Sequence, residues 1–301
     1  MTSPRLLLRA SSVPSFRPIL YWKRVPLASP FLFCYHPGAM KLLFIGDIVG
    51  RPGRDAVKQL LPALKKEFAP DLIIANGENV SGGKGLTAEH AHELKKAGID
   101  FFTSGNHIWK QSSIFAVMDQ KDTFVIRPAN YPDSNPGRGY QIVETDMMKR
   151  ILIINLQGRV FVKEDTDCPF RTLDRILKET AHETLEAIFV DFHAEATSEK
   201  VCFGLYAAER GVSAVVGTHT HVPTADERIL KESTAYISDV GFVGLKDSAI
   251  GVDVEPILKN FLTQMPVKHT ITPGGPVEFN SVLIELNNGK ATSIQRVART
   301  V

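Results

Sequence analysis

Short apolar runs alternate with amphipathic segments along most of the chain, and the two patterns predict different elements. A run of roughly four to eight mostly apolar residues is typical of a buried strand, whereas apolar residues that recur every three or four positions indicate a helix. The predicted strands span residues 41–45, 71–75, 100–103, 139–144, 150–156, 187–192, 212–216, 277–285 and 291–296. The predicted helices span residues 54–68, 87–97, 170–179, 198–210 and 254–264.

The order of these elements predicts the fold class. Strands that alternate with helices favour a mostly parallel central sheet in an α/β protein. Two predicted hairpins add antiparallel strands, one turning at residues 145–149 and the other at Asn287-Asn288-Gly289. We therefore expect a single domain over residues 40–301, in which a pair of sheets is flanked by helices.

Residues 1–39 differ in composition from the rest of the chain. They contain five basic residues and no acidic residue, so they contribute +5, and the remaining residues carry a net charge of −3. An Arg-rich, acid-free leader resembles an organelle transit peptide, but its prolines would break the amphipathic helix that such a peptide needs. We expect residues 1–39 to be a disordered or non-native extension, with Met40 as an alternative start.

Composition excludes several classes of function for the body of the chain. With 44% apolar and 23% charged residues among 301, the chain has the balance of a globular protein. No run approaches the roughly 18–20 apolar residues of a membrane span. The mildly acidic body offers no basic field for a nucleic-acid polymer. Three cysteines without a CxxC pair indicate free thiols in a reducing compartment, which predicts a cytoplasmic protein.

Polar side chains that can bind metals follow five of the predicted strands. These residues are Asp47, Glu78, Asn79, Asn106, His107, His193, His219 and His221. The carboxyl ends of parallel strands face the ligand crevice in α/β sheets, so we expect these side chains to converge. Each segment alone has a simpler interpretation. Gly46-Asp47 is an ordinary strand-to-loop turn, and Glu78-Asn79 is compatible with the start of a helix.

The collected residue types suit a pair of metal ions. Two carboxylates, two carboxamides and three imidazoles favour a borderline metal such as Fe, Mn or Zn. Seven ligands exceed the need of one metal with an open position, so two metals bridged by a carboxylate account for them better. His219 and His221 lie two residues apart, and in an extended segment they would share a face.

At these residues the chain resembles the calcineurin-like metallophosphoesterase superfamily. Its signature runs Gly-Asp-x-His, Gly-Asp, Gly-Asn-His, a lone His and Gly-His-x-His. Val49 replaces the first histidine of that signature, and Glu78 replaces its second aspartate. Both departures match one branch, the YmdB-like 2′,3′-cyclic-nucleotide 2′-phosphodiesterases. The similarity begins at Met40 and is carried by residues 46–53, 76–79, 105–107 and 217–226.

The resemblance implies a sandwich of two mixed β-sheets flanked by helices, with a dinuclear centre, most commonly of iron. Carried over by position, the first metal would be held by Asp47, Glu78, Asn79 and His221. The second would be held by Glu78, Asn106, His193 and His219, with Glu78 bridging. His107 matches the family's proton donor.

The resemblance therefore implies a metal-dependent phosphodiesterase that acts on a small cyclic nucleotide. It cleaves the 2′ bond of 2′,3′-cyclic nucleotides, and 3′,5′-cyclic nucleotides are a further candidate substrate. Another phosphatase activity at the same centre, and a metal-bound regulatory protein with little turnover, remain alternatives. A homo-oligomer is compatible with the sequence. The glycine-rich segment 82–85 could contact phosphate or be a surface loop, and residues 130–132 or 165–170 could cover the base or ribose.

Overall fold

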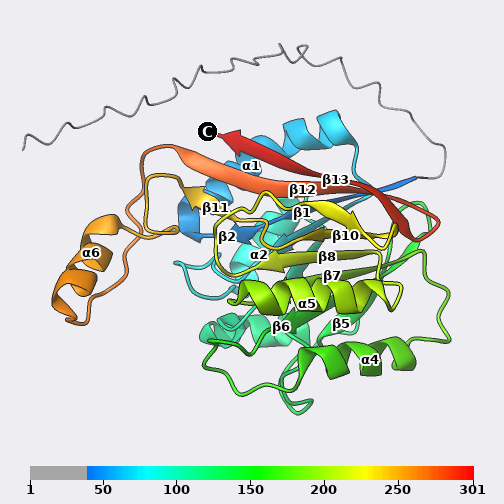
Figure 1. Cartoon of the computed structure of the whole chain (residues 1–301). Coiled ribbons are helices and arrows are strands. Elements are labelled where there is room, and N and C mark those ends of the chain that lie inside the picture. Colours follow the sequence, from blue (N-terminus) through cyan, green and yellow to red (C-terminus); the bar gives the residue numbers. More distant parts are fainter. Residues whose placement is uncertain (1–38) are drawn as a thin grey trace, which may run out of the picture. The chain divides into compact units, whose positions relative to one another are not determined.

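The strands of residues 39–301, the part of the chain that a computed structural model describes, form two mixed sheets (Figure 1). The first sheet contains β1 (Met40–Ile45), β2 (Asp47–Ile48), β3 (Leu72–Asn76), β4 (Phe101–Thr103), β11 (Phe242–Leu245), β12 (Val277–Asn287) and β13 (Lys290–Thr300). The second contains β5 (Tyr140–Glu144), β6 (Arg150–Gln157), β7 (Ala187–His193), β8 (Ala214–Thr218), β9 (Arg228–Leu230) and β10 (Thr234–Ile237).

Six α-helices in the same part of the chain connect these strands or flank the sheets. They are α1 (Gly50–Phe68), α2 (Ala88–Ala97), α3 (Phe115–Met118), α4 (Pro169–Glu179), α5 (Thr197–Ala208) and α6 (Val254–Thr263). Two short 3-10 helices, η1 (Ile108–Lys110) and η2 (Ser112–Ile114), follow β4. No helix of residues 39–301 is both long and apolar enough to cross a membrane.

Both sheets contain parallel and antiparallel strand pairs. In the first sheet, of order β2-β11-β12-β1-β3-β4, strands β1, β3 and β4 are parallel, and β12 pairs antiparallel with β1, β11 and β13. In the second, of order β5-β6-β7-β8-β10-β9, the four central strands are parallel and the two edge strands are antiparallel. The structure confirms the predicted pair of mixed sheets flanked by helices.

Apolar residues fill both faces of the second sheet. In β6, Ile151 and Ile153 join the core that lies between the sheets, whereas Leu152 and Ile154 join the core under α4 and α5. This division follows from the two-residue period of a strand, which points successive side chains to opposite faces. Two buried faces explain why β6 reads as a continuous apolar run.

Sequence signals set the ends of the first two helices. α1 begins at Gly50, four residues before the predicted start, because Pro52 fits the first turn of a helix, where its missing N–H is not needed. At α2 the predicted cap is confirmed, since the hydroxyl of Thr87 accepts a hydrogen bond from the N–H of His90 at 3.2 Å. Gly98 then ends α2 in the left-handed conformation.

The sequence did not predict β9, β10 and β11, which are three or four residues long and follow no clear alternation. Cys168 and Cys202 have free thiols, as predicted for these two residues. The interpretation of residues 1–39 as an extension, and the third cysteine, Cys34, fall outside the described residues, apart from Ala39.

Candidate metal centre

The candidate residues lie at strand ends of both sheets. Asp47 is the first residue of β2 in the first sheet, and His193 is the last residue of β7 in the second. The remaining candidates follow β3, β4 and β8: Glu78, Asn79, Asn106, His107, His219 and His221. The parallel strands deliver these side chains to one region, as the polarity of α/β sheets predicts.

Asp47 and Glu78 are carboxylates with 0% and 1% of their surface exposed. Oδ1 of Asp47 lies 4.0 Å from Nδ1 of His193 and 3.8 Å from Nε2 of His221. Oε1 of Glu78 lies 3.7 Å from Nε2 of His193. Two carboxylates from the first sheet therefore face imidazoles from the second.

His219 and Asn79 join the same cluster. Nδ1 of His219 lies 3.1 Å from Nε2 of His193, and the backbone N–H of His219 donates to Oδ2 of Asp47 at 3.2 Å. Nδ2 of Asn79 lies 3.0 Å from Nε2 of His221. Six of the seven predicted ligands are thus linked by contacts within 4.0 Å.

Asn106 follows a backbone turn that passes directly against this cluster. A Cβ added at Gly105 would lie 2.3 Å from Nε2 of His193, so only glycine allows this approach. Oδ1 of Asn106 is buried and accepts no hydrogen bond.

His107 contacts two of the candidate ligands. Its backbone N–H donates to Oε1 of Glu78 at 2.7 Å, and its Nδ1 lies 2.9 Å from Oδ1 of Asn79 and 3.0 Å from the same Glu78 oxygen. An amide oxygen and a carboxylate oxygen only accept hydrogen bonds, so Nδ1 must carry a hydrogen. The side chain is 28% exposed, and Nε2 is the ring nitrogen left for a substrate.

Both histidines after β8 have left-handed backbone conformations, with φ values of 99° for His219 and 65° for His221. Such conformations cost a non-glycine residue about 1–3 kcal/mol and persist only where their surroundings hold them. Asp239 supplies part of that support, because its Oδ2 accepts hydrogen bonds from the backbone N–H and the hydroxyl of Thr220 at 3.1 and 2.8 Å. Nζ of Lys200 lies 2.6 Å from the same oxygen, and the two side chains are 3% and 2% exposed.

A buried chain of hydrogen bonds orients His193. The hydroxyl of Thr218 donates to Oδ1 of Asp191 at 2.8 Å and therefore accepts from Nδ1 of His193 at 2.9 Å. This arrangement places the ring hydrogen on Nδ1 and leaves the lone pair of Nε2 facing Glu78, which is the form that binds a metal. Burial raises the pKa of Asp191 to about 6, against hydrogen bonds that include one from Asn76 at 2.9 Å.

Burial also shifts the pKa values of the candidate ligands themselves. It raises the pKa of Asp47 well above its usual value, with repulsion from Asp239 as a second cause, and it raises the pKa of Glu78 against contacts from His107. Burial lowers the pKa of His193 well below the ordinary value, and the neighbouring His219 adds to that effect. Neutral imidazole is the form that binds metals, and a nearby cation would stabilise ionised carboxylates.

The donor atoms of the cluster fit metal ions. Oδ1 of Asp47, Oε2 of Glu78 and Oδ1 of Asn106 are all buried without a hydrogen-bond partner. An unpaired buried polar atom costs about 1–3 kcal/mol, and metal coordination would satisfy these oxygens. Within residues 39–301, no group of three or more His, Cys, Asp or Glu side chains is spaced as a formed metal site. The candidate side chains contact one another directly instead.

Four charged residues near the cluster were not predicted as site residues: Asp191, Glu195, Lys200 and Asp239. Oε2 of Glu195 lies 3.1 Å from Nε2 of His219. Asp191 had a usable signal, since a carboxylate within the apolar run of β7 needs buried partners. Asp239 follows β10, whose short strand was not predicted, and nothing in the sequence distinguishes Lys200 from other helix lysines.

Tyr131 and the glycine-rich segment 82–85, both candidates for contacts with substrate, lie in different surroundings. Tyr131 is 7% exposed, and its hydroxyl donates to Oε1 of Gln157 at 3.3 Å, so this tyrosine belongs to the interior. The glycine-rich segment 82–85 is anchored to the cluster, because the N–H of Gly85 donates to the carbonyl of Glu78 at 2.7 Å.

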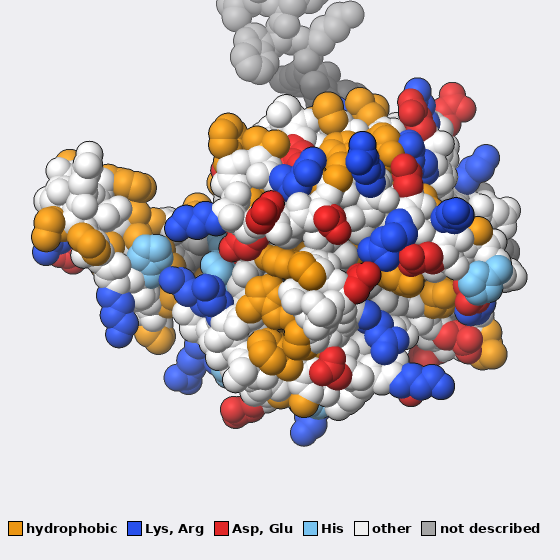
Figure 2. All heavy atoms as spheres, turned by 90° about the horizontal axis from the view of Figure 1, so that it is seen from below, with side chains coloured by type: hydrophobic (Ala, Val, Ile, Leu, Met, Phe, Trp, Pro, Cys, Tyr) orange, Lys and Arg blue, Asp and Glu red, His pale blue; other side chains and the backbone are white. Residues whose placement is uncertain are grey.

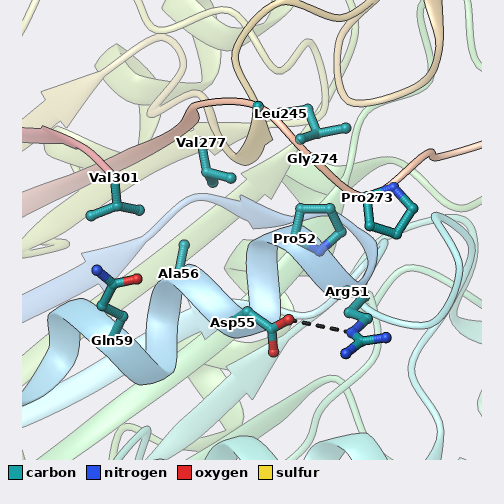
Figure 3. Close-up of a pocket in the computed structure, with 11 residues that line it drawn as sticks. Arg51, Pro52, Asp55, Ala56, Gln59, Leu245, Pro273, Gly274, Val277 and Val301 are labelled. Carbon is teal, nitrogen blue, oxygen red and sulfur yellow. Dashed lines mark ion pairs between the residues drawn. The ribbon is translucent and has the colours of Figure 1, made fainter.

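A separate pocket of about 250 Å³ lies between α1 and the segment that leads into β12 (Figure 3). Arg51 and Asp55 line it and form an ion pair at 3.4 Å, and Pro273 lies on the opposite side. None of the eight candidate residues is among those that line this pocket.

Comparison with known proteins identifies the family. The sequence matches the family described as YmdB-like protein over residues 43–297. The chain belongs to the YmdB-like family. A 2′,3′-cyclic-nucleotide 2′-phosphodiesterase of Bacillus subtilis (strain 168) is 47% identical to it over 260 residues, which cover 86% of this chain and 96% of the relative.

Two solved structures share the YmdB-like fold over nearly their whole length. A hypothetical protein from Thermus thermophilus has a TM-score of 0.80 and 39% identity, and the match covers 87% of this chain and 99% of that protein. A novel phosphatase from Mycoplasma pneumoniae has a TM-score of 0.81 and 34% identity, with 87% and 94% covered. The similarity therefore extends to both sheets and not only to the segments that carry the candidate residues.

Proposed function

We propose that this chain is a metal-dependent phosphodiesterase that cleaves the 2′ bond of 2′,3′-cyclic nucleotides to give 3′-nucleotides. The observation that carries the proposal is the convergence of carboxylates and imidazoles from two sheets, with unpaired buried oxygens on Asp47, Glu78 and Asn106. The activity of the Bacillus subtilis relative at 47% identity supports the same substrate class.

Seven side chains would hold two metal ions. The first set is Asp47, Glu78, Asn79 and His221, and the second is Glu78, Asn106, His193 and His219. When bound, the ions would supply positive charge and Lewis acidity that offset the phosphodiester charge and favour ionisation of water. We expect iron, with Mn and Zn as alternatives, because the set mixes hard oxygen donors with imidazoles.

His107 donates the proton that the leaving group needs. As the oxygen of water bonds to phosphorus and loses one proton to solvent, the bond from phosphorus to O2′ breaks. Its electron pair goes to O2′, which accepts a proton from Nε2 of His107. Hydrogen bonds from its N–H and Nδ1 to Glu78 and Asn79 fix this imidazole beside the proposed ligands.

The decisive experiment compares substrates and metal content in the same preparations. The wild type should hydrolyse 2′,3′-cAMP to 3′-AMP, and metal analysis should find about two ions per chain. His107→Ala should retain that metal content and lose about 10²–10⁴-fold in kcat, the usual contribution of a general acid. His182→Ala is the matched control, because that imidazole is 76% exposed and is not among the candidate residues.

The same panel tests the alternatives. Hydrolysis of 3′,5′-cAMP at least as fast as that of 2′,3′-cAMP would extend the substrate range. A preference for p-nitrophenyl phosphate or a phosphopeptide would instead show that the enzyme is a phosphatase. A metal-loaded wild type that turns over none of these substrates would favour a regulatory role. Full activity of metal-loaded His107→Ala would contradict the assigned proton donor and leave the substrate class standing.

We also propose a cytoplasmic location. The free thiols of Cys168 and Cys202 support a reducing compartment. Fractionation of the source cells, followed by immunodetection, should find the protein with cytoplasmic markers, and recovery with an oxidising compartment would contradict the proposal.

A further inference from the structure

The loop between β6 and α4, residues 158–168, is here called the β6–α4 loop, and it leaves its sheet beside the candidate metal centre. The N–H of Gly158, its first residue, donates to the carbonyl of His193 at 2.9 Å. Two residues after His193, Oε2 of Glu195 lies 3.1 Å from Nε2 of His219. The loop therefore begins against a short segment that includes one candidate ligand and contacts another.

Buried polar side chains hold the β6–α4 loop on both sides of its tip. Oε1 of Glu199 accepts a hydrogen bond from the N–H of Arg159 at 3.0 Å, and its Oε2 accepts one from the N–H of Val160 at 3.1 Å. Beyond the tip, Nδ2 of Asn130 donates to Oγ1 of Thr166 at 3.0 Å. Both Glu199 and Asn130 are buried, so these bonds fix where the tip lies.

Phe161 stands at that tip in a strained backbone conformation. The N–H of Val162 donates to the carbonyl of Arg159 at 3.4 Å, so Phe161 is the third residue of a turn. Its φ is 64°, a value that favours glycine or asparagine at that position of a turn. Because its side chain is 87% exposed, packing within the chain does not offset the strain. Strain that the fold itself does not use points to a contact with a ligand.

The surroundings of Tyr131 connect the β6–α4 loop with the proposed chemistry. Burial raises the pKa of the Tyr131 hydroxyl, and the carboxylates of Glu164 and Glu78 add to that effect. Glu164 belongs to the loop, and Glu78 is the proposed bridging ligand. The ring of Trp109, two residues after the proposed proton donor His107, packs edge-on against that of Tyr131 with centroids 5.3 Å apart. The loop and the residues of the centre therefore border one region.

Position distinguishes Phe161 from other exposed apolar residues. Such side chains are ordinary on a protein surface, and Figure 2 shows them among charged ones on one face. Met148 is also exposed, by 74%, and has a φ of 60°. It lies in the hairpin turn between β5 and β6, where positive φ values are usual. Met148 precedes β6, whereas Phe161 follows β6 at the end of the strand where the candidate ligands gather.

We propose that the ring of Phe161 stacks on the nucleobase of the substrate while the phosphodiester occupies the metal centre. The inference rests on the phosphodiesterase proposal and names the group that binds the rest of the nucleotide. A nucleobase is the flat π system of such a substrate, and aromatic side chains stack on any base because every base has a π face. The enzyme should therefore accept 2′,3′-cyclic nucleotides of all four bases and discriminate against a cyclic phosphate that has no base.

The test removes the ring from the enzyme and the base from the substrate, in all four combinations. The two substrates are 2′,3′-cAMP and the 2,3-cyclic phosphate of methyl β-D-ribofuranoside, which keeps the phosphodiester and the ribose. Phe161→Ala should lower kcat/KM for 2′,3′-cAMP by about 5- to 150-fold, the range that one base–aromatic stack supplies. The loss should fall mainly on KM, because the stack is present before and during bond breaking. For the base-free substrate the change should stay within about twofold.

Two further variants serve as controls, and the metal content of every variant should equal that of the wild type. Met148→Ala removes a similarly exposed side chain with a similar φ from the other end of β6, and it should leave kcat/KM for both substrates unchanged. Phe161→Trp keeps an aromatic face and should retain the wild-type preference for 2′,3′-cAMP over the base-free substrate.

Three results would overturn the stacking of Phe161 and leave the phosphodiesterase proposal standing. They are an unchanged kcat/KM of Phe161→Ala for 2′,3′-cAMP, equal losses on both substrates, and a loss in Met148→Ala as large as that in Phe161→Ala. Equal losses would mean that the ring acts on the loop or the metal centre and not on the base. A metal-loaded wild type that hydrolyses neither substrate would overturn the phosphodiesterase proposal and this inference with it.

Discussion

Replacing Lys200 with methionine should lower the free energy of unfolding by about 3–5 kcal/mol, the cost of leaving a buried charge without its partner. Nζ of Lys200 lies 2.6 Å from Oδ2 of Asp239 and donates to the carbonyl of Thr218 at 2.8 Å. Methionine fills most of the same volume, so the loss comes from charge and not from a cavity.

The remaining partners of Asp239 limit the loss but do not remove it. Its oxygens still accept hydrogen bonds from Thr220 and from the N–H of Gly241 at 2.8 Å. Because Asp239 is only 1% exposed, those bonds offset only part of the cost of burying its carboxylate. Lys200→Met/Asp239→Asn removes the charge as well, and we expect it to recover at least about 1 kcal/mol relative to the single variant.

The assay is equilibrium unfolding in urea, with m-values compared to exclude a change in the surface exposed. At about 2–4 °C per kcal/mol, the melting temperature of Lys200→Met should fall by roughly 10 °C. The control is Lys231→Met, which breaks an exposed pair with Glu209 at 3.8 Å and should cost less than about 1 kcal/mol. A loss of less than about 1 kcal/mol in Lys200→Met would refute the reasoning.

Two further substitutions test the core and the loop after β8. Phe44→Ala should cost about 3–5 kcal/mol in urea unfolding, because Phe44 is fully buried with its ring 5.4 Å from that of Phe189. Phe161→Ala, at an 87% exposed phenylalanine, should stay within about 0.5 kcal/mol, and equal losses would contradict the core assignment. Burial opposes ionisation of Asp226, but hydrogen bonds to its carboxylate outweigh burial and lower its pKa. The ionised carboxylate of Asp226 therefore contributes to the free energy of unfolding at pH values above its ordinary pKa of about 4. That contribution is lost as the pH falls through the lower pKa of the folded protein. The stability gap between wild type and Asp226→Asn should shrink on acidification, and a gap that widens would be contrary to the assigned sign.

The sequence predicted the strands with two apolar faces well, because a continuous apolar run leaves little choice of conformation. It placed β6 and β7 to within a few residues, and the polar residues at strand ends pointed to the region where the candidate ligands meet. It failed at β10 and β11, where short strands are set by their neighbours and not by local pattern. For the same reason the sequence did not indicate a role for Asp239. Asp239 supports the site through contacts with Thr220 and Lys200 that form only in the folded chain.

The left-handed conformations of His219 and His221 also could not be predicted, because this region is uncommon for any residue other than glycine. A His-x-His segment predicted two imidazoles on one face of an extended chain. The structure instead brings them into the cluster through a strained turn, which Asp239 supports. Tertiary contacts outside the segment therefore determine the direction of both side chains.

The position of β1 has a consequence for synthesis of the protein. β1 is among the first described residues, yet it lies between β3 and β12, and β12 begins only at Val277. A ribosome would have to synthesise the chain as far as Val277 before that pairing could form. Contacts so distant in sequence slow folding and leave apolar strand edges exposed to aggregation meanwhile. Nascent chains that stall before residue 277 should therefore depend on chaperones far more than the finished polypeptide does.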